Sequence, residues 1–180
     1  MRYFTSDLHL CHRRIIELAD RPFNDVEEMN DAIIDFINDI VTPEDELWIL
    51  GDIIMGGQEE NLTRLEMINC DLFLILGNHD KAHPLSKKGW EKAWAKLEAL
   101  RNVCRVALED VIDINGHRVN VCHFPYGEDE YQRDAHLPYY PKNDGNWLLH
   151  GHVHGQWFIK GKMVNVGIDA APGLVSDSQI

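Results

Sequence analysis

The sequence is short of basic residues, of long apolar runs and of cysteine, and each shortage excludes a class of protein. Seventeen Lys and Arg stand against 30 Asp and Glu, which gives a net charge of −13 in 180 residues. Proteins that bind long nucleic acids or anionic membranes need a basic surface, so we expect neither as a partner. Apolar runs such as residues 72–76 are far shorter than the ~18 residues of a membrane span. Because an acidic residue already stands at position 7, no secretory signal is expected, and the predicted location is cytoplasmic.

The cysteine pattern excludes two further classes. The four cysteines, Cys11, Cys70, Cys104 and Cys122, include no C-x-x-C pair, so we expect neither structural zinc nor a thioredoxin-like redox motif. We interpret them mainly as small core residues, because a chain of this length folds as one domain, 1–180, without disulfides. Histidine, in contrast, is plentiful: ten are present, and several stand beside Asp, Asn or Gly.

Hydrophobic patterning predicts an α/β first half and a mostly β second half. Strands are expected at 2–5, 46–50, 71–76, 103–108, 111–114, 118–122 and 147–149, and helices at 13–19, 26–40, 61–69 and 90–100. Asp25 and Glu28 have capping-box spacing at the start of the second helix. Strand–helix–strand order predicts parallel strands joined by right-handed crossovers. Asn115-Gly116 predicts a type I′ hairpin, and a last hairpin is expected to turn at Gly161.

Five short polar segments begin where a predicted strand stops. They are Asp7-Leu8-His9, Gly51-Asp52, Gly77-Asn78-His79-Asp80, His123 and Gly151-His152-Val153-His154. In open α/β sheets, sites form beyond the carboxyl ends of the strands, so these side chains are expected at one rim. Their donors are oxygen and imidazole nitrogen without thiolate, which favours Mn, Fe, Zn, Co or Ni. Each segment alone is weak evidence, whereas the ordered set predicts a metal site.

This ordered series resembles the calcineurin-like metallophosphoesterases, and the stretches 7–12, 21–23 and 28–30 resemble their small bacterial and phage members. The resemblance implies a four-layer α/β/β/α sandwich, in which helices flank two mixed sheets. It also implies two divalent ions, with manganese first and Fe, Zn, Ni or Co as alternatives. The first ion is assigned to Asp7, His9, Asp52 and His154. The second is assigned to Asp52, Asn78, His123 and His152, with Asp52 bridging.

The resemblance implies a role for three further residues. His79 corresponds to the histidine that protonates the leaving oxygen, and imidazole has a suitable pKa for a general acid. His12 and Arg21 are candidates for substrate binding, although ordinary structural roles fit both equally well. Two carboxylates, two divalent ions and a bridging hydroxide sum to +1, so the site can hold a phosphate in an acidic protein. Residues 53–57 lack the Asp and Arg of the protein-phosphatase branch, so Asp80 or a backbone carbonyl is left to orient His79.

The predicted function is hydrolysis of a small phosphodiester, such as a 2′,3′-cyclic nucleotide, by attack of a metal-bridging hydroxide. A phosphomonoesterase and a nucleotide pyrophosphohydrolase use the same centre and are the enzymatic alternatives. The alternative that is not an enzyme is a non-catalytic scaffold of the same fold. A nuclease is disfavoured by the net charge. The loop 126–146 either stacks a base or forms a polar surface excursion, through aromatic and basic residues that include Tyr126, Tyr131, Arg133, His136, Tyr139 and Tyr140. Substrate, native metal and oligomeric state are left open.

Overall fold

The first of two sheets combines the strands of the N-terminal half with one late strand. The computed structural model describes residues 1–180 except 57–58, 128–134 and 172. The strand order is β10-β1-β2-β3-β4, with bounds β1 Arg2–Thr5, β2 Glu46–Leu50, β3 Asp71–Ile75, β4 Val103–Ala107 and β10 Val175–Ser176. The predicted parallel pairing is confirmed for β1, β2 and β3, whereas β10 runs antiparallel to β1. Thr5 pairs with Ile49 and Leu50 with Ile75, so the carboxyl ends of these strands meet at one edge.

The second sheet contains the remaining strands in the order β5-β6-β7-β9-β8. Their bounds are β5 Glu109–Ile114, β6 His117–Cys122, β7 Trp147–His150, β8 Ile159–Lys160 and β9 Met163–Asn165. The hairpin between β5 and β6 has positive φ at Asn115 and Gly116, as a type I′ turn requires. Strands β6 and β7 are parallel, with Val121 opposite Leu149, so their carboxyl ends also coincide.

Among the described residues, four α-helices accompany the first sheet: α1 Arg13–Leu18, α2 Val26–Asn38, α3 Glu59–Leu62 and α4 Trp90–Glu98. The Asp25 side chain caps α2 by accepting bonds from the amides of Glu27 and Glu28, which confirms the predicted helix start. The predicted helix at 61–69 is wrong in its bounds. It begins at residue 59 and tightens into a 3₁₀ turn over Thr63–Met67. The Asn102 side chain donates to two carbonyls there, Leu65 and Ile68, and so ends the helix without a further turn.

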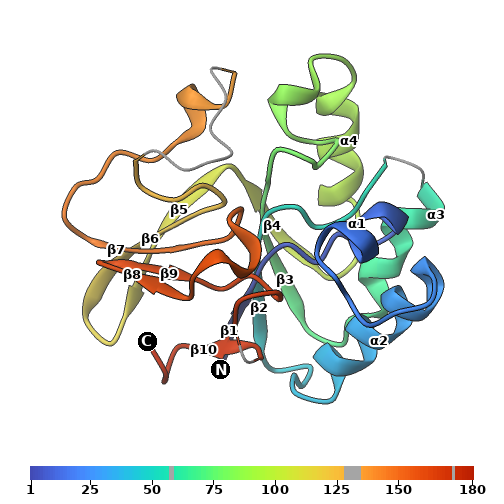
Figure 1. Ribbon diagram of the computed structural model, residues 1–180, viewed down its shortest axis with the longest axis horizontal. Helices are drawn as coiled ribbons and strands as arrows, with labels where there is room; N and C mark the ends of the chain where they lie inside the picture. Colours follow the sequence, from blue (N-terminus) through green and yellow to red (C-terminus); the bar gives the residue numbers. More distant parts are fainter. Residues whose placement is uncertain (57–58, 128–134, 172) are drawn as a thin grey trace.

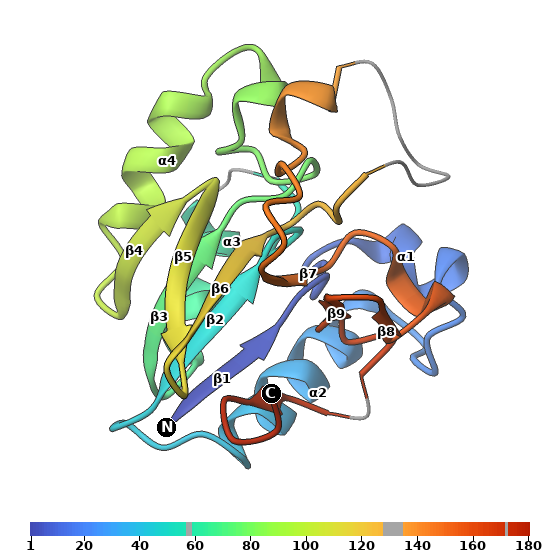
Figure 2. The same cartoon turned by 90° about the vertical axis from the view of Figure 1, so that its left-hand side faces the viewer.

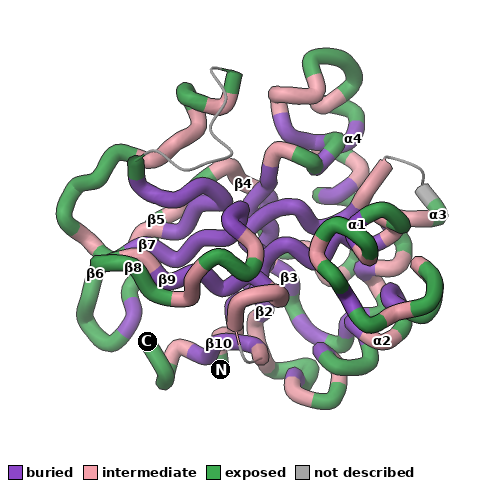
Figure 3. The backbone as a smooth tube through the Cα atoms, in the orientation of Figure 1, coloured by how far each residue is buried: buried purple, intermediate pink, exposed green. Residues whose placement is uncertain are grey.

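Two hydrophobic clusters hold the layers together. The larger lies between the helices and the first sheet, and all four helices contribute to it, for example through Ile15, Ile34, Leu62 and Leu97. The second lies between the two sheets and joins residues such as Leu50 and Leu149. Figure 1 shows the helices on one side and strands β5 to β9 on the other, and Figure 2 shows the same arrangement turned by 90°. Buried backbone follows the central strands to their ends (Figure 3).

The outer layer of the second sheet differs from the helical layer that the resemblance implies. Within the described ranges, the chain there contains a short 3₁₀ turn, Leu137–Tyr139, and the second sheet carries no described α-helix. Tyr139 and Tyr140 pack against a small cluster that contains Cys122 and Phe124. The predicted fold of two mixed sheets with flanking helices is therefore confirmed.

The cysteines are all free thiols, and only two of them are core residues. Cys70 and Cys122 are buried, Cys11 is half-buried and Cys104 is exposed on β4. Because Cys104 is exposed on an edge strand, the interpretation as a core residue is wrong for it. Across the described part of the chain, no helix combines the length and apolarity needed to cross a membrane.

The core between helices and sheet predicts a matched pair of stability effects. Ile49 is 0% exposed in β2, whereas Ile159 is 57% exposed in β8. We expect Ile49→Ala to lower the free energy of unfolding by about 2–5 kcal/mol, because it removes buried methyl groups and leaves a cavity. Ile159→Ala is the control and should change it by less than about 0.5 kcal/mol. Urea denaturation measures both, and equal effects would contradict the assigned layers.

Candidate metal centre

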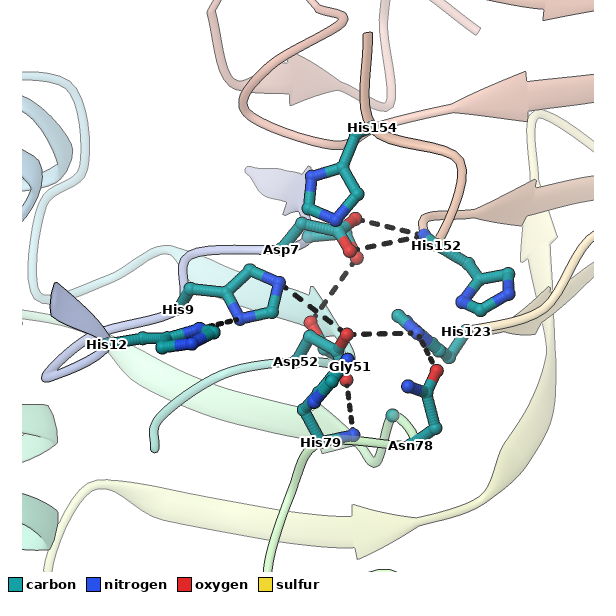
Figure 4. Close-up of polar contacts among 12 residues, drawn as sticks. Asp7, His9, His12, Gly51, Asp52, Asn78, His79, His123, His152 and His154 are labelled. Atoms are coloured by element: carbon teal, nitrogen blue, oxygen red, sulfur yellow. Dashed lines mark hydrogen bonds and ion pairs between the residues drawn. The ribbon is translucent and has the colours of Figure 1, made fainter. Parts of the chain in front are cut away.

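The five polar segments predicted from the strand ends converge at one rim of the molecule. The residues follow β1, β2, β3, β6 and β7, and Figure 4 shows their side chains gathered around a common centre. A cavity of about 770 Å³ opens over them, and its lining includes His9, Asp52, Asn78, His152 and His154. The parallel register of the strands produces this convergence, because it brings their carboxyl ends to the same edge.

Two buried carboxylates lie at the bottom of this site. Asp7 is 0% exposed and Asp52 is 2% exposed. Asp7 accepts hydrogen bonds from the amide of His152, at 3.0 and 3.2 Å, and Asp52 accepts one from the amide of His79 at 2.9 Å. Burial, followed by the negative charge of Asp7, raises the pKa of Asp52 above its ordinary value. Two like charges in a dry site are costly, and a bound cation relieves both.

The ring of His123 is oriented from behind by the backbone. Its Nδ1 lies 2.9 Å from the carbonyl oxygen of Leu50, so Nδ1 is the protonated nitrogen and donates. In the neutral ring the lone pair is then on Nε2, which faces Asn78 Oδ1 at 3.2 Å and Asp52 Oδ2 at 3.5 Å. A nitrogen lone pair and two oxygens that face one another make an unfavourable arrangement without a cation. This set fits a divalent ion.

His9 provides a second sign of an ion site. Its Nε2 is buried without a hydrogen-bond partner, 3.6 Å from Asp52 Oδ2. Its Nδ1 lies 3.2 Å from Nδ1 of His12, which belongs to the same loop. Burial, followed by the nearby His154 and His79, lowers the pKa of His9. The ring is therefore neutral, which is the form that binds a metal.

The donor atoms form two overlapping groups. Those of Asp7, His9 and His154 lie within 4.8 Å of one another, and so do those of Asp7, Asp52 and His123. Asp7 belongs to both groups, whereas the resemblance implies Asp52 as the bridge. Asn78 adjoins the second group through His123. The ring of His152 lies 5.1 Å from that of His123, and its Nε2 is 3.4 Å from the Tyr140 hydroxyl. The structure thus brings the seven predicted ligands together, and their division between two ions stays a prediction.

The backbone of the site is unusual at the predicted ligands themselves. Nine described residues other than glycine have positive φ, and five of them are predicted ligands: Asp7, His9, Asp52, His152 and His154. Such conformations cost of order 1–3 kcal/mol each and persist where the surroundings enforce them. They turn the chain sharply after β1, β2 and β7, where these ligands lie.

Two motif glycines are required by close approach of the carboxylates. A Cβ at Gly77 would lie 2.3 Å from Oδ1 of Asp52, and one at Gly151 would lie 2.3 Å from Oδ2 of Asp7. Any larger residue would push a ligand carboxylate out of place. This explains physically why the third and fifth polar segments combine glycine with metal-binding residues.

The remaining predicted residues take different positions. His79 is exposed at the cavity, with its ring centroid 5.5 Å from that of His9. His12 also lines the cavity. Arg21 is buried, and its guanidinium donates to Asp169 and to the carbonyls of Asp7 and Leu8, so its observed partners are protein groups. Its role in substrate binding is untested.

Three supporting residues escaped prediction or received another role. Asp80 accepts from the amides of Ile53 and Gly77, at 2.9 and 2.7 Å, so it ties two ligand loops together, and both its oxygens are used. Asn165 donates to the carbonyl of His154. Asp169 bonds the ring of His154. Asp80 belongs to the third predicted segment and was a candidate to orient His79, whereas its observed partners are the two loop amides. Asn165 and Asp169 carry no local signal.

The aromatic loop after residue 126 is largely structural where it is described. Tyr126 is buried, and Tyr140 stacks on Phe124 with ring centroids 4.8 Å apart. His136 lines the cavity. Tyr131 and Arg133 lie outside the described residues, so base stacking by them is a prediction that stays open.

Comparison with known proteins agrees with this geometry. The family described as calcineurin-like phosphoesterase matches residues 3–156. The Gene 66 protein of Mycobacterium phage L5 is 34% identical over 189 residues, which cover 99% of this chain and 91% of that protein. An uncharacterized protein of Methanocaldococcus jannaschii is 31% identical over 176 residues, which cover 93% and 81%. The chain belongs to the calcineurin-like phosphoesterase family.

Two solved structures share the fold. A protein of unknown function from Aquifex aeolicus superposes with a TM-score of 0.66 at 23% identity, over 94% of this chain and 90% of that one. An archaeal phosphodiesterase superposes with a TM-score of 0.53 at 13% identity, over 94% and 83%. The buried Asp and His groups then define a metal-dependent phosphoesterase site on this fold.

The raised pKa of Asp52 predicts that ion binding is coupled to proton release. A divalent ion must displace any proton that the buried carboxyl holds, so affinity should rise with pH. For one displaced proton, we expect the affinity for Mn²⁺ to fall about tenfold per pH unit below the pKa of Asp52. Calorimetric titration in two buffers of different ionisation enthalpy counts the protons. Asp52→Asn removes this titrating group and should lower the number of protons released, whereas the same proton release in the variant would contradict the assignment.

Proposed function

We propose that this protein is a metal-dependent phosphodiesterase that hydrolyses small phosphodiesters, such as 2′,3′-cyclic nucleotides. The observation that carries the proposal is the convergence of buried Asp7 and Asp52 with ring nitrogens that face them, beneath a cavity that opens to solvent. The proposed ligands are Asp7, His9, Asp52, Asn78, His123, His152 and His154. Manganese is the first choice of ion, with Fe, Zn, Ni or Co as alternatives.

The ions would supply positive charge for the phosphoryl oxygens and an activated water. The chain itself holds the donors in position. The carbonyl of Leu50 orients the ring of His123. The amide of His79 donates to Asp52, and the amide of His152 donates to Asp7. These contacts set the geometry of the site before any substrate enters, which lowers the cost of reorganisation during the reaction.

His79 is the proposed general acid. Its ring is exposed in the cavity, where it can reach a leaving oxygen. Its backbone amide is anchored on Asp52, which keeps the residue beside the ligands. Imidazole in general has a pKa near neutrality, which suits a group that must donate a proton to a leaving alkoxide.

The charge of the cavity favours a diester over a monoester. Among the described residues that line it, none is Lys or Arg, and the exposed Asp20 adds a negative charge that neither an ion nor Arg21 is proposed to neutralise. A monoester carries close to two negative charges at neutral pH and a diester carries one. Like charges in contact are unfavourable, so the monoanion is accommodated more easily.

The shape of the cavity favours a substrate with an apolar organic group. One wall comes from α1 and presents Ile15, Leu18 and Ala19 beside the ion ligands. Leu18 is 63% exposed, so a ligand that covers it gains the burial of an apolar side chain. About 770 Å³ is enough for a nucleotide-sized molecule, since ligand pockets usually measure roughly 300–1,000 Å³.

The proposed partner is therefore a small phosphoester, and the proposed setting is cytoplasmic. The net charge of −13 repels polyanions, which argues against long nucleic acids and anionic membranes. The intact set of donors around the cavity argues against a purely non-catalytic scaffold.

The direct test compares two chromogenic esters with protein that has been stripped of ions and reloaded with Mn²⁺. We expect kcat/KM for bis-p-nitrophenyl phosphate to exceed that for p-nitrophenyl phosphate by about tenfold or more, equivalent to about 1.4 kcal/mol. The reverse order favours the phosphomonoesterase, and preferred cleavage of nucleotide pyrophosphates favours the pyrophosphohydrolase. If the ion-loaded protein cleaves none of these esters, the proposal is overturned and the non-catalytic scaffold is the hypothesis that remains.

Substitution of His79 tests its role in proton transfer. We expect His79→Ala to lower kcat by about 10²–10⁴-fold, the usual contribution of a general acid, while the ion content is retained. His117→Ala is the matched control, because His117 is exposed on β6 away from the cavity. Steady-state kinetics with elemental analysis measures both variants. Unchanged kcat in His79→Ala removes the residue from the mechanism.

Substitution of Leu18 tests the apolar wall. We expect Leu18→Ala to raise KM for bis-p-nitrophenyl phosphate by about 3–10-fold, because roughly 1 kcal/mol of apolar burial is lost, with kcat unchanged. Met67→Ala is the control, since Met67 is 52% exposed but does not line the cavity. Equal KM values for wild type and Leu18→Ala would place the organic group elsewhere.

A further inference from the structure

Asp169 lies next to the proposed ion site, although it comes from a segment without any motif. Its Oδ2 lies 2.8 Å from Nδ1 of His154, fifteen residues earlier in the chain. The carboxylate is only 13% exposed. Burial alone would raise the pKa of Asp169, but hydrogen bonds from His154 and Arg21 hold it below its ordinary value. The group is therefore an ionised acceptor, and His154 Nδ1–H is the donor.

Arg21 anchors this carboxylate from the other side. Its Nε lies 2.9 Å from Oδ1 of Asp169, and one terminal nitrogen lies 3.0 Å from Oδ2, which is a bidentate pair. The same terminal nitrogen donates to the carbonyl of Asp7 at 2.6 Å, and the other donates to that of Leu8 at 2.8 Å. One buried guanidinium thus joins the loop that carries Asp7 to the carboxylate that holds His154.

The contact decides which nitrogen of His154 is available to an ion. With Nδ1 engaged by Asp169, Nε2 is the nitrogen left to bind an ion, and in the neutral ring it carries the lone pair. The donor atoms of His154, His9 and Asp7 lie within 4.8 Å of one another, so that lone pair faces the shared site. Carboxylates that bond metal-binding histidines in this way fix the tautomer and the rotation of the ring. Arg21 also cancels the charge of Asp169, so this arrangement adds no net charge beside Asp7 and Asp52.

We propose that Asp169 is a positioning residue for the His154 ligand and that Arg21 holds it in register with Asp7. The inference rests on the proposed function only in requiring that His154 binds an ion, and it is independent of the substrate. It also gives Arg21 a structural role behind the site, which is one of the two roles that the sequence left open.

The test measures ion binding by Asp169→Asn. We expect the affinity for the first Mn²⁺ site to fall about 10–100-fold, the usual cost of losing a partner behind a ligand, with the second site unchanged. Asp20→Asn is the matched control, because Asp20 is exposed and lines the same cavity. It should change neither affinity by more than about twofold, since distant exposed charges are screened. Wild-type affinities at both sites in Asp169→Asn would overturn the inference.

A second measurement examines the ring without any ion and remains informative if Asp169→Asn folds poorly. ¹⁵N spectra of the ion-free wild type at pH 9 should show His154 protonated on Nδ1. In Asp169→Asn, the proton should move toward Nε2. A wild-type ring protonated on Nε2 contradicts the inference by itself. Protein that binds two ions and shows the expected tautomer, yet cleaves no phosphoester, would refute the proposed function and leave this inference standing.

Discussion

The burial of two neighbouring carboxylates, Asp7 and Asp52, is the constraint on which the rest of the structure depends. Moving an unpaired carboxylate out of water costs several kcal/mol even after relaxation. The chain offsets part of this cost with the amides of His79 and His152. No described Lys or Arg side chain lines the cavity beside them. The site is therefore built to be completed by cations.

The strained geometry of the ligands depends on the sheets behind them. Each ligand segment leaves a buried strand, and five ligands have positive φ. The chain would relax from such conformations if the strands were mobile. The cluster between the sheets and the cluster beneath the helices hold the strand ends in register. Asp80 then ties the loop after β2 to the loop after β3. The geometry of the site therefore depends on the packing of the core behind it.

Charge acts at two distances in this protein. The excess of acidic residues sets the long-range field, which disfavours large polyanions. Salt screens that field within roughly 8 Å at physiological ionic strength, so a small anion at the site responds mainly to its immediate neighbours. The positive charge of Arg21 is paired with Asp169 behind the ligands, and Arg21 does not line the cavity. The proposed preference for a small monoanionic ester follows from this distribution.

The sequence by itself determined the positions of most strands and helices, the hairpin at Asn115 and the set of donor residues. These follow from hydrophobic periodicity, turn chemistry and residue type, which are local properties. Tertiary structure alone decided that Arg21 contacts Asp169, 148 residues away, and that Asp7 belongs to both donor groups. It also ended the helix after α3, where Asn102 binds the free carbonyls. Such contacts depend on how two sheets pack, and no short stretch of chain contains that information.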